Sequence, residues 1–202
     1  SLTATTAANI LPNCFSKEHQ FEYDFFDAAI NYIDEKLQNE VQVRDGASIV
    51  CGQINHQMKE IITAHLGDSR ALIVSKSRKV KVLTKPHITT SRREFERILM
   101  KGGRVVNKKT DGKLPVSRAL ADYGVVGVSN SPEFSHIKFE DDDKFFVLAS
   151  GGVFKALTPD EIAQITADCD SAWDAAYRIK NIAFGRKNRD NISVIVVPLN
   201  FK

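Results

Sequence analysis

The chain has 202 residues, of which 43% are hydrophobic and 26% are charged, so it can bury one sizeable core and we expect a single domain over residues 1–202. This balance excludes a chain that is disordered throughout. The formal net charge of +3 and the pI near 8.7 fall short of the clustered basic face that nucleic-acid binding requires, so no nucleic-acid partner is expected.

The first forty residues are predicted to form a leader and one helix. Residues 1–15 are expected to be a loose leader. Ser16 is a candidate cap for an N-terminal helix over residues 16–40, because the apolar residues that follow recur every three to four positions. They are Phe21, Phe25, Phe26, Ala29, Ile30, Ile33 and Leu37. We expect this stripe to face the core rather than a partner.

The middle of the chain has the pattern of β-hairpins. Asp45-Gly46 predicts a turn into a strand over residues 47–54. Polar turn residues then separate further runs rich in β-branched and apolar residues. The predicted strands are 60–66, 71–75, 80–83, 134–139, 145–150 and 192–197.

Two sequences with the pattern of a helix capping box predict further helices. Ser91-Arg-Arg-Glu94 precedes one helix, which Gly102-Gly103 ends. Thr158-Pro-Asp-Glu161 begins another, with Pro159 at its first position. A last helix before Gly185 is marked by Trp173, Ala176, Ile179, Ile182 and Ala183. Runs of strands followed by helices indicate an α+β fold of two packed antiparallel sheets flanked by helices.

Cysteine usage and hydropathy indicate a cytoplasmic or nuclear location. Cys14, Cys51 and Cys169 are far apart and include no CxxC pair, which favours reduced thiols over a disulfide framework or a zinc site. No apolar run reaches the roughly 18 residues of a membrane span, and the first residues lack a signal peptide. The chain does not begin with Met, which leaves open a leader or a further domain before it.

Eight short blocks over residues 46–197 together resemble the protein phosphatase 2C family of metal-dependent serine/threonine phosphatases. The blocks are Gly46-Ala-Ser48; Leu66-Gly-Asp-Ser-Arg-Ala71; Leu83-Thr84 with His87; Glu94-x-x-Arg97-Ile98 leading to Gly102-Gly103-x-Val105; Leu114-Pro-Val-Ser-Arg-Ala-Leu120 with Asp122; Pro132-Glu133; Phe145–Gly152; and Arg189-Asp-Asn191. The resemblance implies the sandwich fold of this family, reduced at its N-terminus.

The family's chemistry depends on metal, and the resemblance implies that this chain has lost most of the ligands. Members use two divalent cations, Mn or Mg, to activate a water that attacks the phosphoryl group. Their Asp-Gly-His-Gly-Gly motif, which supplies the bridging aspartate, does not occur in this sequence. Gly151 stands where the family has a second metal-binding aspartate, so this ligand position is lost. Asp190 and Asp68 remain as matches to ligand positions.

Two isolated carboxylates cannot assemble a binuclear centre, so we expect no metal, no cofactor and no catalytic residue. For Asp68 we favour a structural role in an Asx-type turn, and Asp190-Asn191 can likewise hold the turn into the last strand. Ala121 replaces a family glycine, and the segment 123–131, which forms a flap beside the cleft in active members, is short. The five histidines include no i, i+4 pair, so a histidine-based zinc site is not expected.

Three classes of function remain open. The leading hypothesis is a pseudophosphatase, an inactive domain that binds another protein as an adaptor or regulatory module, with a component of a kinase or phosphatase pathway as the candidate partner. The second is an atypical active phosphatase that is completed by missing N-terminal residues or by a partner chain. The third is a purely structural assembly module.

Overall fold

A computed structural model describes residues 1–14, 22–41, 45–186 and 190–200. The chain forms two compact units. The first unit comprises Ser1–Ile49, Ala64–Asp68 and Pro86–Glu133, and the second comprises Val50–Thr63, Ser69–Lys85 and Phe134–Lys202. Among the described helices, none combines the length and the hydropathy needed to traverse a bilayer.

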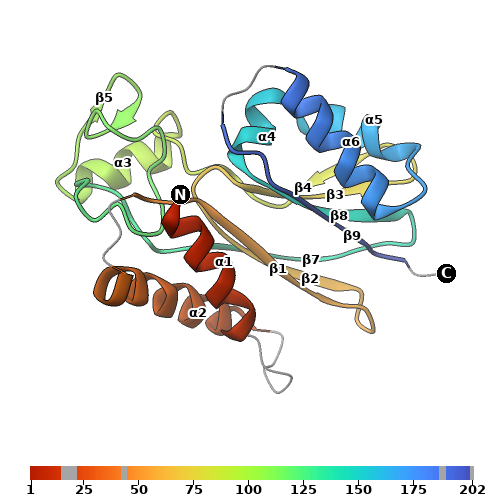
Figure 1. Cartoon of the computed structure of the whole chain (residues 1–202), viewed down its shortest axis with the longest axis horizontal. Helices are drawn as coiled ribbons and strands as arrows, with labels where there is room; N and C mark the ends of the chain where they lie inside the picture. The colour runs from red at the N-terminus through yellow and green to blue at the C-terminus, as the bar shows by residue number, and fades with distance from the viewer. Residues whose placement is uncertain (15–21, 42–44, 187–189, 201–202) are drawn as a thin grey trace. The chain divides into compact units, whose positions relative to one another are not determined.

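Two sheets contain the long strands (Figure 1). The larger has the order β4-β3-β8-β9, with β3 (Arg70–Ser75), β4 (Val80–Val82), β8 (Asp143–Ala149) and β9 (Val194–Pro198). Its pairs are antiparallel, and Leu72, Val147 and Val196 lie side by side across three strands. The smaller sheet has the order β1-β2-β7, with β1 (Ile49–Asn55), β2 (Glu60–Leu66) and β7 (Glu133–Lys138). The predicted α+β fold of antiparallel sheets and helices is confirmed.

The two sheets pack face to face within the second unit. Ile61 of β2 meets Ile73 of β3 and Phe146 of β8 in one buried cluster. Gly52 is required here, because a Cβ at this position would lie 2.8 Å from the ring of Phe146. The absent side chain therefore makes room for the ring of Phe146.

Three helices cover the other face of the larger sheet, as Figure 1 shows in cyan and blue. They are α4 (Gly151–Ala156), α5 (Pro159–Ala167) and α6 (Ala172–Gly185). Leu72 and Val147 pack beneath them. The capping box predicted at Thr158 is confirmed, since Thr158 Oγ accepts from Glu161 N–H and the Glu161 carboxylate accepts from Thr158 N–H.

The first unit is built from helices and loops. Its elements are α1 (Leu2–Cys14), α2 (Tyr23–Lys36), a π-helical turn η1 (Leu37–Val41), α3 (Arg92–Met100) and the short strands β5 (Val105–Val106) and β6 (Lys109–Thr110). The loose leader predicted over residues 1–15 is wrong, because residues 2–14 are helical. Thr3 is buried and its hydroxyl donates to the Asp45 carboxylate at 2.9 Å, a long-range tether that no local pattern reveals. The predicted cap at Ser16 lies outside the described residues, and α2 begins after Glu22.

The capping box predicted at Ser91 is also wrong, because the Ser91 side chain makes no capping hydrogen bond. Glu94 instead turns inward and is buried. Its carboxylate accepts from the guanidinium of Arg118 at 2.6 Å, from Arg97 at 3.0 Å and from the Ser117 hydroxyl at 2.6 Å. Burial alone would raise the pKa of Glu94, but these hydrogen bonds hold it at about 2.

A second buried carboxylate, Asp34 of α2, holds the flap segment 123–131 together with Ala121, which precedes it. It accepts from the backbone N–H of Ala121 at 2.8 Å and from the side chain of Asn130 at 3.0 Å. The Tyr123 hydroxyl donates to the Asp34 carbonyl at 2.8 Å. Ala121 and Asp122 have φ of +57° and +56°, a left-handed conformation that favours glycine, so these hydrogen bonds offset backbone strain.

The Glu94 cluster predicts a specific acid sensitivity. Because the pKa of Glu94 is about 2 in the folded chain and near 4.5 otherwise, its ionised form stabilises the fold above pH 4.5, and this contribution is lost as the pH falls toward 2. At pH 6, Glu94→Gln should lower the free energy of unfolding by about 3 kcal/mol or more, since it leaves a buried guanidinium without its charge partner. At pH 3 the loss of unfolding free energy caused by Glu94→Gln should be about 2 kcal/mol smaller than at pH 6, as measured by urea unfolding. Glu96→Gln on the exposed face of α3 is the control, and an equal pH dependence in both variants would contradict the assignment.

Removal of the Asp34 carboxylate should loosen the flap. Asp34→Ala leaves the buried N–H of Ala121 without an acceptor, and we expect a loss of about 2–4 kcal/mol in the free energy of unfolding. Glu35→Ala, at the neighbouring exposed position of α2, should change it by less than about 0.5 kcal/mol. Chemical denaturation measures the free energy of unfolding of both variants. A similar loss in the two would show that the hydrogen bonds of Asp34 do not stabilise the flap.

Candidate functional site

The three positions that the family resemblance singles out are divided between the units. Asp68 follows β2 in the first unit, whereas Gly151 and Asp190 belong to the second. Within the described part of the chain, the Asp68 carboxylate has no hydrogen-bond or ion-pair partner, so the predicted Asx-type turn is not formed. Gly67 makes the turn instead, since its φ of +84° is a conformation open to glycine.

In the second unit, the loop that contains Asp190 packs directly on the start of α4. A Cβ on Gly152 would lie 2.3 Å from the Asn191 carbonyl oxygen and 3.2 Å from Asp190 Cβ. The lost ligand position at Gly151 is therefore beside the remaining ligand position at Asp190. Ser150 fixes this arrangement, because its hydroxyl donates to the Asn191 carbonyl at 2.9 Å and accepts from Ser193 N–H at 3.0 Å.

The charge of Asp190 is balanced by a cation of the chain itself. Lys155 follows Gly151 by one turn of α4, and its ammonium forms an ion pair with the Asp190 carboxylate. Both side chains are about half exposed, so the pair is a surface interaction of small energetic weight. Its chemical effect is local: the remnant carboxylate faces a positive charge rather than further carboxylates.

These residues do not fit a Mn or Mg centre. A hard divalent cation requires several oxygen ligands and the negative charge of more than one carboxylate. In the described second unit, Gly151 offers no side-chain oxygen and Asp190 is already paired with an ammonium. We therefore derive no metal-dependent step for this chain.

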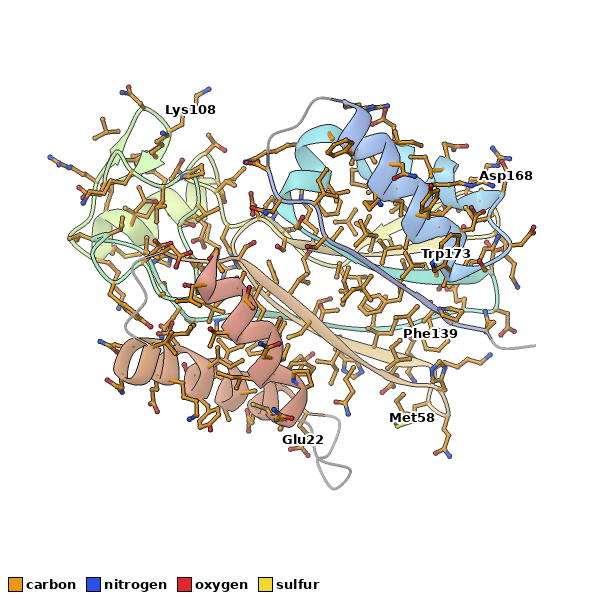
Figure 2. All side chains as sticks on the ribbon, in the orientation of Figure 1. Glu22, Met58, Lys108, Phe139, Asp168 and Trp173 are labelled. Atoms are coloured by element: carbon orange, nitrogen blue, oxygen red, sulfur yellow. The ribbon has the colours of Figure 1, made fainter. Side chains whose placement is uncertain are left out.

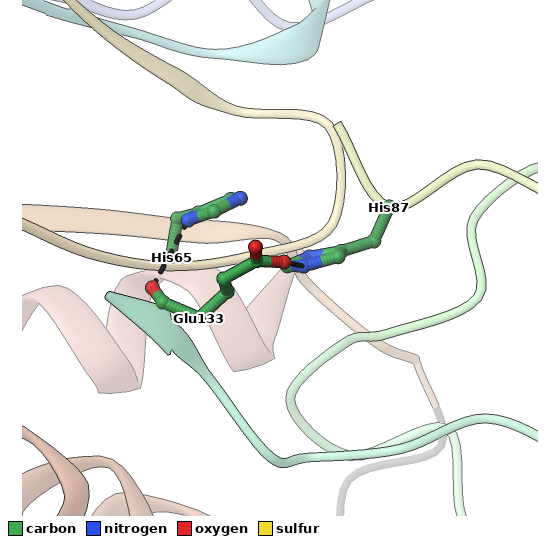
Figure 3. Close-up of side chains that lie close together, drawn as sticks. All are labelled: His65, His87 and Glu133. Atoms are coloured by element: carbon green, nitrogen blue, oxygen red, sulfur yellow. Dashed lines mark hydrogen bonds and ion pairs between the residues drawn. The ribbon is translucent and has the colours of Figure 1, made fainter. Parts of the chain in front are cut away.

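A different cluster of possible ligands lies in the first unit (Figure 3). His65 of β2, His87 from the loop after β4 and Glu133 at the start of β7 place one ligand atom each within 4.8 Å of one another. The two imidazole rings are stacked, with centroids 4.4 Å apart and planes 10° apart. Both rings are buried, and Glu133 is partly exposed.

Hydrogen bonds define the proton positions in this cluster. The backbone N–H of Gly67 donates to His87 Nδ1 at 3.2 Å, so this nitrogen must be an acceptor. The proton of the neutral ring is then on Nε2, which donates to the Glu133 carboxylate at 3.0 Å. Burial lowers the pKa of His87 to about 4, and His65 and Arg118 act in the same direction. The contact between His87 and Glu133 is therefore a hydrogen bond from a neutral imidazole and not an ion pair.

The same hydrogen bonds make the cluster a poor metal site. A metal-binding imidazole usually donates its other ring N–H to an acceptor, whereas the second nitrogen of His87 accepts from Gly67. Metal at Nε2 would displace the proton of an already neutral ring. Arg93 also donates to the second oxygen of Glu133 at 3.1 Å. We interpret the cluster as a hydrogen-bonded anchor between β2, β7 and the His87 loop.

Sequence spacing missed this cluster because its residues are 22 and 46 positions apart. The search for i, i+4 pairs applies only to residues on one helix, and these three come from two strands and a loop. A signal was nonetheless present, since His87 and Glu133 both belong to the eight blocks. The fold brings those two blocks together through Gly67 and His65.

Comparison with known proteins agrees with the resemblance. The family model for protein phosphatase 2C matches residues 4–192. A probable protein phosphatase 2C 28 of Arabidopsis thaliana is 34% identical over 170 residues, covering 81% of this chain and 49% of the relative. A human relative, named integrin-linked kinase-associated serine/threonine phosphatase 2C, is 32% identical over 179 residues, covering 77% of this chain and 45% of the relative.

A solved structure described as a C. elegans sex determining protein has the same fold, with a TM-score of 0.81 and 24% identity over 98% of this chain and 51% of that one. The chain spans about half the length of the curated relatives it matches. The family model covers nearly all of the chain, and the eight blocks fall within a fold that the solved structure shares. This chain belongs to the protein phosphatase 2C family.

Proposed function

We propose that this domain is a pseudophosphatase, catalytically inactive and used as a protein-binding adaptor or regulatory module. The observation that carries the proposal is the ion pair between Asp190 and Lys155 beside Gly151. An ammonium attached to the chain neutralises the one remnant carboxylate of this loop. It therefore competes with any divalent ion for the same oxygens.

The charge count supports the loss of catalysis. A two-metal centre holds about four positive charges, which several carboxylates must offset while they orient the attacking water. The ligand positions in the second unit retain a single aspartate, and Lys155 cancels its charge. The bridging aspartate motif does not occur in the sequence. Ligands of a shared centre act together, so losses of this kind are not additive.

A binding role is supported by what the fold keeps. The face-to-face sheets, the covering helices and the flap held by Asp34 are all in place without the ligand set. The human relative is named for its association with a kinase. We therefore propose a protein partner from a kinase or phosphatase pathway.

The second candidate is an atypical enzyme that is completed by residues outside this chain. One observation favours it: the Asp68 carboxylate is partly exposed and, among the residues that the structure describes, has no partner that would compete with a metal ion. The curated relatives are also named as phosphatases. Hydrolysis by the chain itself distinguishes the two candidates.

The unmodified chain should not hydrolyse p-nitrophenyl phosphate above the rate of a metal-free blank at millimolar Mn or Mg. Asp190→Ala should leave that background unchanged, because Asp190 holds Lys155 rather than a metal. The assay is colorimetric, and the folded state is checked by circular dichroism. An active family member measured in the same buffer is the positive control. Metal-dependent turnover that Asp190→Ala abolishes, with folding intact, would support the atypical enzyme instead.

Restoration of one ligand should restore metal binding without catalysis. In Gly151→Asp with Lys155→Ala, two adjacent carboxylates are no longer neutralised, and we expect Mn affinity to rise by about tenfold or more over the unmodified chain. Hydrolysis should stay at background because the bridging carboxylate is still absent. Isothermal titration measures the affinity, and Lys101→Ala controls for the loss of a lysine. Equal affinity in the double variant and the unmodified chain would show that the Lys155 pair is not what excludes the metal.

A further inference from the structure

Helix α6 presents large aromatic side chains to solvent. Trp173 is 73% exposed, Tyr177 is 49% exposed and Phe184 is 74% exposed. The opposite face of the helix is buried, since Ala175 and Ile179 pack in the cluster beneath α4–α6. Figure 2 labels Trp173 on this helix. Exposed aromatic residues of this size are typical of interaction sites when they gather on one surface.

The aromatic residues have the spacing of a coiled-coil seam. Trp173, Tyr177, Lys180 and Phe184 are separated by four, three and four residues, which places them on one narrow stripe over about 16 Å of helix. A stripe of this width is narrower than the apolar face that a helix turns toward its own core. α6 therefore has two faces: a broad one that packs in the domain and a narrow one, here called the α6 seam.

The side chains of the seam contact one another within the chain. The rings of Trp173 and Tyr177 are stacked with centroids 5.1 Å apart and planes 11° apart. The Lys180 ammonium lies 5.3 Å from the centre of the Tyr177 ring. Rigid aromatic side chains lose little conformational entropy on binding, which makes Trp and Tyr frequent energetic centres of interfaces.

Lys180 indicates the charge of the partner. It lies in the middle of the seam, and no carboxylate of the described residues forms an ion pair with it. The nearby carboxylate of Asp174 on the same helix is bound to Arg178 at 2.9 Å. A helix that covers the seam would place apolar side chains around the stem of Lys180, and a carboxylate on that helix within reach of the ammonium would stabilise the complex.

We propose that the α6 seam docks an amphipathic helix of a partner protein, with an aspartate or glutamate opposite Lys180. The proposal rests on the binding role proposed above and does not depend on the loss of catalysis. Leucine-sized side chains would fill the space between the Trp173–Tyr177 stack and Phe184, where the stem of Lys180 lies. The acidic residue would fix the register, as a single polar residue does in a coiled coil.

A second copy of this chain fits the seam less well. In a parallel pair the two Lys180 side chains would lie opposite each other, and in an antiparallel pair they would occupy adjacent layers. Neither arrangement supplies a carboxylate, since Asp174 is held by Arg178. Like charges in a dehydrated seam disfavour self-association.

Binding to the seam can be followed by intrinsic fluorescence, because Trp173 is the only tryptophan of the chain. Two designed helical peptides of equal length, each with leucines at a and d positions, would be titrated into the full chain. One carries a glutamate at the position facing Lys180 and the other a lysine. We expect the glutamate peptide to shift Trp173 emission to the blue with saturation, and to bind about tenfold or more tightly than the lysine peptide.

A charge exchange completes the test. Lys180→Glu should reverse the preference, so that the lysine peptide binds more tightly, whereas Arg92→Glu at an exposed position of α3 should leave it unchanged. Equal binding of both peptides, or no binding, would overturn the proposal. A blue shift that grows with protein concentration alone would overturn it in favour of self-association. None of these readouts uses hydrolysis, so failure here is distinguishable from failure of the pseudophosphatase proposal.

Discussion

The buried carboxylate of Glu94 organises much of the first unit, because, once removed from water, it is matched by two cations of the same chain. Arg118 and Arg97 supply the charge, and the same guanidinium groups also donate to the Ser131 and Gly127 carbonyls. One ion cluster thus connects α3 with the loops that follow it. A hydrophobic cluster of equal volume would pack these elements without fixing their register.

Asp190 also faces a cation of the chain, although this pair lies at the surface. In an active family member, divalent ions would supply the positive charge, whereas here the ammonium of Lys155 faces the Asp190 carboxylate. An ammonium cannot polarise a water as a divalent metal ion does. A loop in which a lysine stands against the aspartate fits the binding role proposed above.

Local patterns predicted the strands well, since β2 spans residues 60–66 as expected and the helix after Thr158 has its capping box. They failed where a distant contact decides the outcome. Residues 2–14 are helical with a tether from Thr3 to Asp45, and Ser91 loses its capping partner because Glu94 pairs with Arg118. The cluster of His65, His87 and Glu133 likewise exists only after folding, because its members share no local period.

The hydrogen bonds of Asp34 have a consequence for local unfolding. Because α2 holds the backbone of Ala121 and the side chain of Asn130, fraying of this helix would release both ends of the flap at once. Helix and flap would therefore open as one cooperative unit, with amide protons of both exchanging at a common rate. A ligand that contacts only α2 could change the mobility of a loop far along the sequence, without any need for a change in the sheets.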